Sequence, residues 1–223
     1  MAHVITKIER PSKEVIDSFR GIGTATIHEA SGKKGAVDFN IKPITRGVRI
    51  CGSAFTVQCH PLDNLMLHKA LEKAQPEDVL VATVGGCYEG GYFGGLMTTS
   101  AVARNLGGLA IDGCIRDSEE LIRMGFPIFC RGFSIRGTTK QVLGLINHPV
   151  IFGGIEVHPG DLIVGDDDGM VAVSREQCKS ILEKSLERIE TEKKKAAQLS
   201  TGVPGVVLSK LDKVFESLGL IED

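Results

Sequence analysis

Several features that would point to a particular class of protein are scarce in this chain of 223 residues. There is no tryptophan, aromatic residues make up 5% of the sequence, and no run of like charges exceeds three residues. The net charge is -2, and a nucleic-acid surface normally needs a clustered basic excess, so we expect no nucleic-acid partner. No apolar run is long enough to span a membrane, and the polar first residues do not resemble a signal peptide. We therefore expect a cytoplasmic protein with no membrane partner.

The six cysteines do not have the spacing of a metal or redox site. None forms a CxxC pair, and most stand singly in apolar runs such as GVRIC and PIFC. We interpret them as buried free thiols rather than as disulfides or zinc ligands. There is also no G-x-S-x-G nucleophile motif and no lysine in an apolar run, so the sequence supports neither a serine nucleophile nor a Schiff base.

Through the middle of the chain, strand-like apolar runs alternate with segments of helical spacing. The runs are residues 48–59, 79–85, 108–113 and 127–133, and the helical segments are 64–74, 93–106 and 117–125. This alternation is typical of parallel βαβ units and predicts an α/β fold.

The pattern changes after residue 148. Three apolar runs are separated by the turn-forming residues HPGD and DDDG, which predicts antiparallel strands. Residues 175–199 then predict a long charged helix, and residues 206–218 a last short one. We expect one α/β domain over residues 1–174 and a C-terminal helical arm over residues 175–223 that packs on a neighbouring subunit.

The first candidate site is the segment IDGCIRDSEEL at residues 111–121. It ends one predicted strand and begins a helix, and ligands of open α/β sheets bind beyond the carboxyl ends of strands. Arg116 could bind a carboxylate with two hydrogen bonds, and Asp117 could ligate Mg²⁺ or Mn²⁺. In the alternative, structural interpretation, Asp117 caps the helix and Arg116 pairs with a nearby acid.

The second candidate is the glycine-rich stretch GGCYEGGYFGGLMTTSA at residues 85–101. It has neither a Walker pattern nor G-x-G-x-x-G, so nucleotide binding has little support. Glycines before a helix still let backbone N–H groups bind an anion such as a carboxylate. The alternative is a turn that only packs closely on its neighbours.

Two further groups of polar residues have simpler structural explanations. Asn64 and His68 are four residues apart, share one face of a predicted helix and could line a polar cleft, although a lone histidine is more often structural. The acids at 166–168 could suggest a cation site, but Asp-Gly between two apolar runs is explained more simply as a hairpin turn.

These segments, in order and spacing, resemble the class II 4-hydroxy-4-methyl-2-oxoglutarate / 4-carboxy-4-hydroxy-2-oxoadipate aldolase family. Its relatives include the regulator of ribonuclease E activity. The resemblance covers roughly residues 20–195 and is most specific around GYFG, IDGxxRD and MGFPxF. It implies a swivelling β/β/α fold and a homo-oligomer, a homotrimer or homohexamer, with active sites between subunits.

The resemblance also implies roles for individual residues. Asp117 would hold Mg²⁺ or Mn²⁺, and Arg116 would bind the carboxylate of a 2-oxo acid substrate. Gly94 and Gly95 would form the substrate-binding loop. The amides of Leu96 and Met97 would help to bind pyruvate there. An acid on the C-terminal helix of the neighbouring subunit would reach the metal through water. Glu192 is the best match by spacing, and Glu190 is the alternative.

The implied reaction is cleavage of a 4-hydroxy-2-oxo dicarboxylic acid to pyruvate and a second oxo acid by a lyase, with oxaloacetate decarboxylation as a side activity. The chain departs from the family pattern at Gly95, where relatives carry an acid expected to position a catalytic water. It also ends differently from the aldolases. The alternative function is therefore a non-catalytic regulatory binding protein resembling the ribonuclease E regulator.

Overall fold

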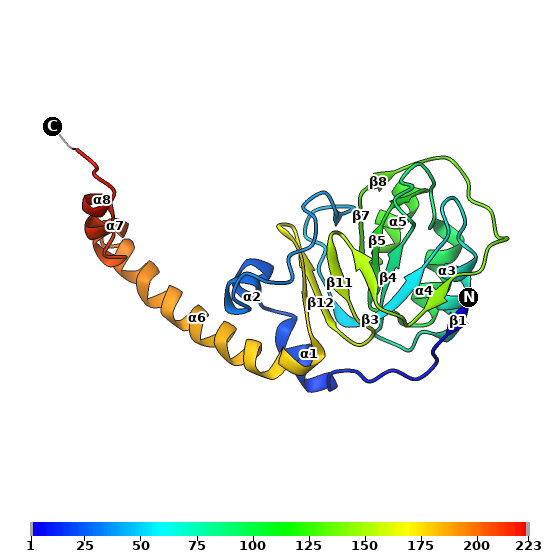
Figure 1. The fold of residues 1–223 in the computed structure, drawn as a ribbon, viewed down its shortest axis with the longest axis horizontal. Coiled ribbons are helices and arrows are strands. Elements are labelled where there is room, and N and C mark those ends of the chain that lie inside the picture. Colours follow the sequence, from blue (N-terminus) through cyan, green and yellow to red (C-terminus); the bar gives the residue numbers. More distant parts are fainter. Residues whose placement is uncertain (1, 222–223) are drawn as a thin grey trace.

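The predicted alternation of strands and helices folds into a nine-stranded mixed sheet (Figure 1). The computed structural model describes residues 2–221. Seven strands follow one another across the sheet, in the order β1, β9, β3, β4, β5, β7, β2. Their bounds are β1 His3–Val4, β9 Leu145–Ile146, β3 Ile50–Gln58, β4 Val79–Thr83, β5 Gly108–Asp112, β7 Ile128–Cys130 and β2 Lys42–Pro43.

The centre of this sheet is parallel, as predicted. β3 pairs with β4, β4 with β5, and β5 with β7, all in parallel. Three helices make the crossovers, and their bounds are α3 Leu65–Lys73, α4 Gly95–Ala103 and α5 Ser118–Met124. In the register of β4 and β5, Thr83 lies opposite Asp112, so the carboxyl ends of the two strands lie side by side. The loops that follow these strands therefore meet at one edge of the sheet.

The later strands are antiparallel, which confirms that part of the prediction. β10 Val150–Phe152 pairs with β11 Ile155–Val157, and β12 Leu162–Asp166 pairs with β13 Gly169–Val173. β12 also joins β3 in antiparallel fashion, which attaches this hairpin to the main sheet. The predicted strand over residues 127–133 is divided, because the chain leaves β7 at Arg131 and continues as β8 Gly132–Phe133. β8 pairs in parallel with β6 Cys114–Ile115.

Two short helices and one long helix lie beside the β12–β13 hairpin. They are α1 Lys13–Phe19, α2 Thr24–Ala30 and α6 Cys178–Leu199, the last preceded by a 3-10 turn at Arg175–Gln177. Only the first half of α6 packs on this body, where Cys178, Ile181 and Ser185 are buried. The rest of α6 leads away from the sheet (Figure 1). No helix within residues 2–221 is long and apolar enough to cross a membrane.

The single helix predicted over residues 206–218 is wrong. The structure has two shorter helices, α7 Gly205–Leu208 and α8 Asp212–Ser217. Lys210 lies between them with a φ of 53°, in the left-handed region. A helix cannot continue through such a residue, so this segment forms two short helices in place of one.

Candidate functional site

The glycine-rich loop and the Arg116–Asp117 segment lie against each other at the carboxyl edge of β4 and β5. The amide of Tyr92 donates to the carbonyl of Cys114 (3.0 Å), and the amide of Arg116 donates to the carbonyl of Phe93 (2.9 Å). Gly91 forms a parallel bridge with Cys114. The two segments that the sequence suggested as separate candidates are therefore one site.

Asp117 occupies the N-cap position of α5, but its side chain makes no capping hydrogen bond to that helix. Its Oδ2 instead accepts the amide N–H of Gly95, at 3.0 Å, at the beginning of α4. The backbone of Asp117 is left-handed, with a φ of 60°, a conformation that costs an L-residue energy and is enriched at functional sites. The structural interpretation of Asp117 as the cap of its own helix is thus wrong.

Glycines 91 and 94 make room for Arg116. A Cβ at Gly91 would lie 2.8 Å from Cβ of Arg116, and a Cβ at Gly94 would lie 3.1 Å from its Nε. The same Cβ at Gly94 would collide with Oδ2 of Asp117. These glycines are thus needed for close approach of the Arg116 and Asp117 side chains. The Nε of Arg116 lies 3.6 Å from Oδ2 of Asp117, so the guanidinium also compensates that carboxylate.

The carboxylate of Glu120, a residue that sequence reasoning missed, lies beside Gly95. A Cβ added at Gly95 would collide with the carboxylate of Glu120. The family resemblance implies an acidic side chain at this position of α4, and in this structure a carboxylate from α5 lies in that space. Glu120 is three residues after Asp117 and therefore on the first turn of α5. Only the packing of α5 on α4 reveals this, because the sequence of either helix alone gives no signal of it.

A cavity of about 110 Å³ adjoins this edge. Its lining comes from α3, the glycine-rich loop, the start of α4, Arg116 and the segment after β8, and consists of Asn64, His68, Gly91, Tyr92, Gly94, Leu96, Met97, Arg116, Thr138 and Lys140. Asn64 and His68, which the sequence placed on one face of a helix, both line this cavity. Gly95, Leu96 and Met97 lie in the first turn of α4, where amide N–H groups have no acceptor within the helix.

Glu192 does not join these residues within one chain. It lies on α6, which leads away from the body that carries the cavity (Figure 1). Its carboxylate forms an ion pair with Arg188 on the same helix, at 2.8 Å. Glu190 pairs with Lys193 in the same manner. Either acid could therefore reach a site only on another copy of the chain.

The protein ligands available to a metal ion here are few. Within residues 2–221, no group of three or more His, Cys, Asp and Glu side chains could hold a metal ion. Asp117 still offers a half-exposed carboxylate whose Oδ1 accepts no hydrogen bond from the described residues. Mg²⁺ is commonly bound by one or two carboxylates, with waters and substrate oxygens completing its shell. Asp117 fits a cation of that kind and does not fit a cation that needs a full protein cage.

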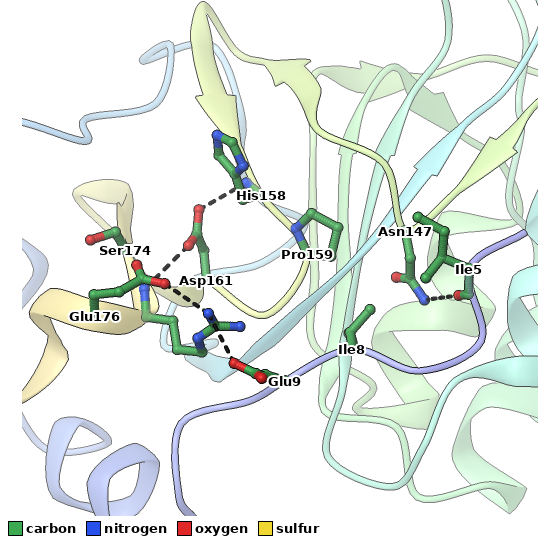
Figure 2. A pocket seen from close by; sticks show the side chains of 10 residues that line it. Ile5, Ile8, Glu9, Asn147, His158, Pro159, Asp161, Ser174 and Glu176 are labelled. Atoms are coloured by element: carbon green, nitrogen blue, oxygen red, sulfur yellow. Dashed lines mark hydrogen bonds and ion pairs between the residues drawn. The ribbon is translucent and has the colours of Figure 1, made fainter.

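A larger cavity of about 560 Å³ lies elsewhere, between the N-terminal segment and the turn before β12 (Figure 2). Its charged groups are largely paired with one another. Asp161 accepts the amides of His158 and Arg175, and the Arg175 guanidinium pairs with Glu9 and Glu176. Burial raises the pKa of Asp161, although the two amides act against it. These contacts join the turn before β12 to the segment after β13 and to the N-terminal segment. We therefore interpret them as structural.

The acids at 166–168 belong to a hairpin turn, as the structural interpretation predicted. Asp166 pairs with Gly169 at the end of the β12–β13 ladder. Its carboxylate accepts the amide of Thr24 at 2.9 Å and the hydroxyl of Thr24 at 2.6 Å, and thereby caps α2. Asp167 accepts the amide of Gly47.

All six cysteines are free, four of them buried, in agreement with the prediction of buried thiols for those four.

The fold and this site define an α/β protein with a small cavity beside Arg116 at the carboxyl edge of a parallel sheet. A family model described as RraA-like, Aldolase/RraA, matches residues 15–172. The chain belongs to this Aldolase/RraA family.

Individual relatives agree with the family assignment. A protein of Halalkalibacterium halodurans named "Putative 4-hydroxy-4-methyl-2-oxoglutarate aldolase" is 33% identical over 86% of this chain and 92% of its own length. A solved structure of an uncharacterized protein from Pseudomonas syringae superposes with a TM-score of 0.81, 27% identity, and coverage of 89% of this chain and 93% of that one. The Streptomyces coelicolor protein RraAS2, titled an unusual member of the RNase ES inhibitor RraA family, gives a TM-score of 0.77 at 28% identity, covering 85% and 99%.

Proposed function

We propose that this protein is a divalent-metal-dependent lyase that cleaves a 4-hydroxy-2-oxo dicarboxylic acid to pyruvate and a second oxo acid. The observation that carries the proposal is the placement of Asp117, which leaves its own helix uncapped and turns its carboxylate toward the start of α4. The name of the relative from Halalkalibacterium halodurans supports the same reaction.

In this reaction the groups at the edge of the cavity bind the substrate and the metal ion. Arg116 binds the carboxylate next to the 2-oxo group, and the amides of Leu96 and Met97 donate to the same end of the substrate. A Mg²⁺ or Mn²⁺ ion held by Asp117 would supply a Lewis acid that stabilises the negative charge developing on the 2-oxo group.

Glu120 is the group that we propose as the proton acceptor. Its carboxylate lies beside Gly95, at the start of α4, next to the position of Asp117. It would take the proton of the 4-hydroxyl group, directly or through a water, while the bond between C3 and C4 breaks. The electron pair of that bond passes to the pyruvate half, which is then protonated at C3. Decarboxylation of oxaloacetate also leaves an electron pair on the pyruvate half, with negative charge developing on its 2-oxo group. We therefore propose it as a side activity.

We also propose that the active protein is a homotrimer or homohexamer in which the arm over residues 175–223 packs on a neighbouring copy. Exposed apolar residues along this arm, among them Leu186, Val214 and Leu218, support that contact. Glu192 of the neighbouring copy would then reach the metal through water. Light scattering gives the oligomeric state. Loss of metal-dependent turnover in Glu192→Gln, but not in Glu190→Gln, would identify the acid.

The decisive experiment is release of pyruvate, coupled to lactate dehydrogenase, from three compounds with Mg²⁺, Mn²⁺ or EDTA. The compounds are 4-carboxy-4-hydroxy-2-oxoadipate, 4-hydroxy-4-methyl-2-oxoglutarate and oxaloacetate. We expect turnover that EDTA removes and the metal restores. Folded, oligomeric protein that turns over none of them contradicts the lyase. That result would favour a regulatory binding protein like the Streptomyces coelicolor inhibitor family member.

A further inference from the structure

The larger cavity, of about 560 Å³, shares no lining residue with the cavity beside Arg116. The N-terminal segment that forms one of its walls is held at both ends. Nδ2 of Asn147 donates to the carbonyl of Ile5 at 2.8 Å, and Arg10 donates two hydrogen bonds, of 2.7 and 2.8 Å, to the buried carboxylate of Asp78. The wall is thus in place before a ligand binds, so binding needs little reorganisation.

The charges that line this cavity are predominantly negative. Glu9, Asp161 and Glu176 are acidic, whereas Arg175 is the single arginine among the lining residues, and no lysine is among them. The guanidinium of Arg175 pairs with Glu9 and Glu176. Three carboxylates against one guanidinium leave an excess of two negative charges when His158 is neutral. A positively charged ligand would compensate this excess.

Asp161 is the carboxylate best placed to bind such a ligand. It is 7% exposed, and its oxygens accept the amides of His158 at 2.8 Å and Arg175 at 3.2 Å. Among the described residues, no lysine or arginine side chain lies within ion-pair distance of it. Burial raises the pKa of Asp161, although the two amides act against it. Each oxygen can accept a second hydrogen bond, and a cation there would favour the charged carboxylate.

On the other side of the cavity, a buried amide oxygen has no partner. Asn147 is 1% exposed, and its Nδ2 is used by the carbonyl of Ile5, whereas its Oδ1 accepts no hydrogen bond from the described residues. Figure 2 shows this oxygen on the side of Asn147 that faces Pro159, away from Ile5. A buried acceptor without a donor costs free energy, so a ligand that donates to it is favoured.

The surface between these two acceptors is apolar. Asp161 lies on one side of the cavity and Asn147 on the other, with Pro159 and Ile8 between them (Figure 2). A bare metal ion does not suit this arrangement, because within residues 2–221 no group of three or more His, Cys, Asp and Glu side chains could hold one. The lining instead suits a ligand with a positive group at one end, a hydrogen-bond donor at the other, and an apolar stem.

We propose that this cavity is a second ligand site that binds a linear aliphatic diamine. One ammonium group donates to Asp161, the other end donates to Oδ1 of Asn147, and the methylene chain lies across Ile8 and Pro159. Glu9 and Glu176 strengthen binding through their charge. The site does not depend on the lyase reaction, because it shares no residue with the cavity at which that reaction is proposed.

Isothermal titration calorimetry of the full chain at low salt tests the ligand class. The probes are 1,4-diaminobutane, 1,5-diaminopentane and 1,6-diaminohexane, each compared with the monoamine and the diol of the same chain length. We expect one of the diamines to bind about tenfold more tightly than its monoamine, because the second amino group satisfies a buried acceptor. The diol should bind more weakly still, since it carries no charge. The proposal is overturned if no diamine binds, or if each binds no better than its diol.

The variant Asp161→Asn tests where the ammonium group binds. Asparagine keeps the size of the side chain and removes its charge, so we expect affinity for the diamine to fall about tenfold or more. Glu183→Gln, which alters an exposed acid of α6 outside the cavity, is the control and should stay within about twofold of wild type. Urea denaturation checks that Asp161→Asn is folded. Wild-type affinity in the folded variant overturns the assignment.

A double variant of exposed residues keeps the test decisive if Asp161→Asn does not fold. The side chains of Glu9 and Glu176 are 83% and 67% exposed, so Glu9→Gln/Glu176→Gln should fold normally. It removes two negative charges from the rim and leaves the guanidinium of Arg175 unpaired. We expect affinity for the diamine to fall about fivefold relative to the control Glu183→Gln/Glu187→Gln, which has the same net charge. Equal affinities in the two double variants overturn the site.

Discussion

Two aspartates in different parts of the fold make the same kind of contact with the start of a helix. Asp117 accepts an amide at the start of α4, and Asp166 accepts an amide at the start of α2. Each carboxylate thus stabilises the beginning of a helix that is distant in sequence, where N–H groups need an acceptor.

The two aspartates differ in how completely their carboxylates are used. Asp166 has a side chain 14% exposed and accepts two hydrogen bonds from Thr24 and one from the amide of Asp168. Asp117 is 43% exposed, accepts one amide, and has a left-handed backbone. A carboxylate whose oxygens both accept hydrogen bonds, on a backbone of ordinary geometry, indicates a structural role. A carboxylate with an oxygen that accepts no hydrogen bond, on a strained backbone beside a cavity, indicates a binding role.

The strongest test of this comparison is Asp117→Asn. Asparagine keeps an acceptor for the amide of Gly95 and tolerates the left-handed backbone, but it is a much weaker ligand for a divalent cation. We expect kcat/KM for the 4-hydroxy-2-oxo acid to fall about 10³-fold, since several kcal/mol of transition-state stabilisation is lost. The urea midpoint should stay at the wild-type value. Wild-type kcat/KM in this variant would remove Asp117 from the site.

The second test concerns Gly95, where the family resemblance implies an acid. The structure places the carboxylate of Glu120 where a side chain at this position would begin, so an introduced acid would have to displace it. We expect Gly95→Asp to lower kcat/KM about 100-fold by displacing Glu120 and adding a like charge. Gly21→Asp is the control, since nothing lies within 4 Å of a Cβ there. Higher activity of Gly95→Asp would show that Glu120 does not replace the missing acid.

At the other aspartate the expected effect is on stability. Asp166→Ala removes the cap of α2 and leaves the amide and hydroxyl of Thr24 without their acceptor. We expect the free energy of unfolding in urea to fall by about 2 kcal/mol, while kcat/KM of the folded protein stays unchanged. A large loss of kcat/KM without loss of stability would show that Asp166 acts in the reaction rather than as a structural residue.

The smallest effect should appear in the pH dependence of stability. Burial raises the pKa of Asp166, but its hydrogen bonds with Thr24 outweigh burial and leave the pKa below the ordinary value of 3.8. The stabilisation is therefore fully present above the unfolded pKa and is lost as the pH falls through the lower, folded pKa. Urea denaturation of Asp166→Asn between neutral and acidic pH should show a shallower acid loss than the wild type. If the free energy of unfolding of the two proteins falls equally at acidic pH, other carboxylates cause the loss of stability.

Much of the fold was predictable because it depends on local patterns. The alternation of apolar runs predicted the parallel centre, and the turn residues before and after β12 predicted the antiparallel hairpins. The division of residues 205–217 into α7 and α8 was missed, because nothing in the sequence signals a left-handed Lys210.

The candidate site was predictable only in part. Arg116, Asp117 and the glycines were identified from their position between a strand and a helix and from the family resemblance. The partner of Asp117 was not, because a residue at an N-cap position ordinarily caps its own helix.

The sequence by itself determined the order of strands and helices, the glycines that permit close approach, and membership of the Aldolase/RraA family. The tertiary structure decided which groups meet: Asp117 and Glu120 with the start of α4 at Gly95, and Asp166 with Thr24 at the start of α2. Local periodicity and turn chemistry act over a few residues and can be read from the chain. Contacts between segments far apart in sequence, such as Asp166 with Thr24 across 142 residues, depend on strand register and on loops fixed by buried groups, and these are set only when the whole sheet has formed.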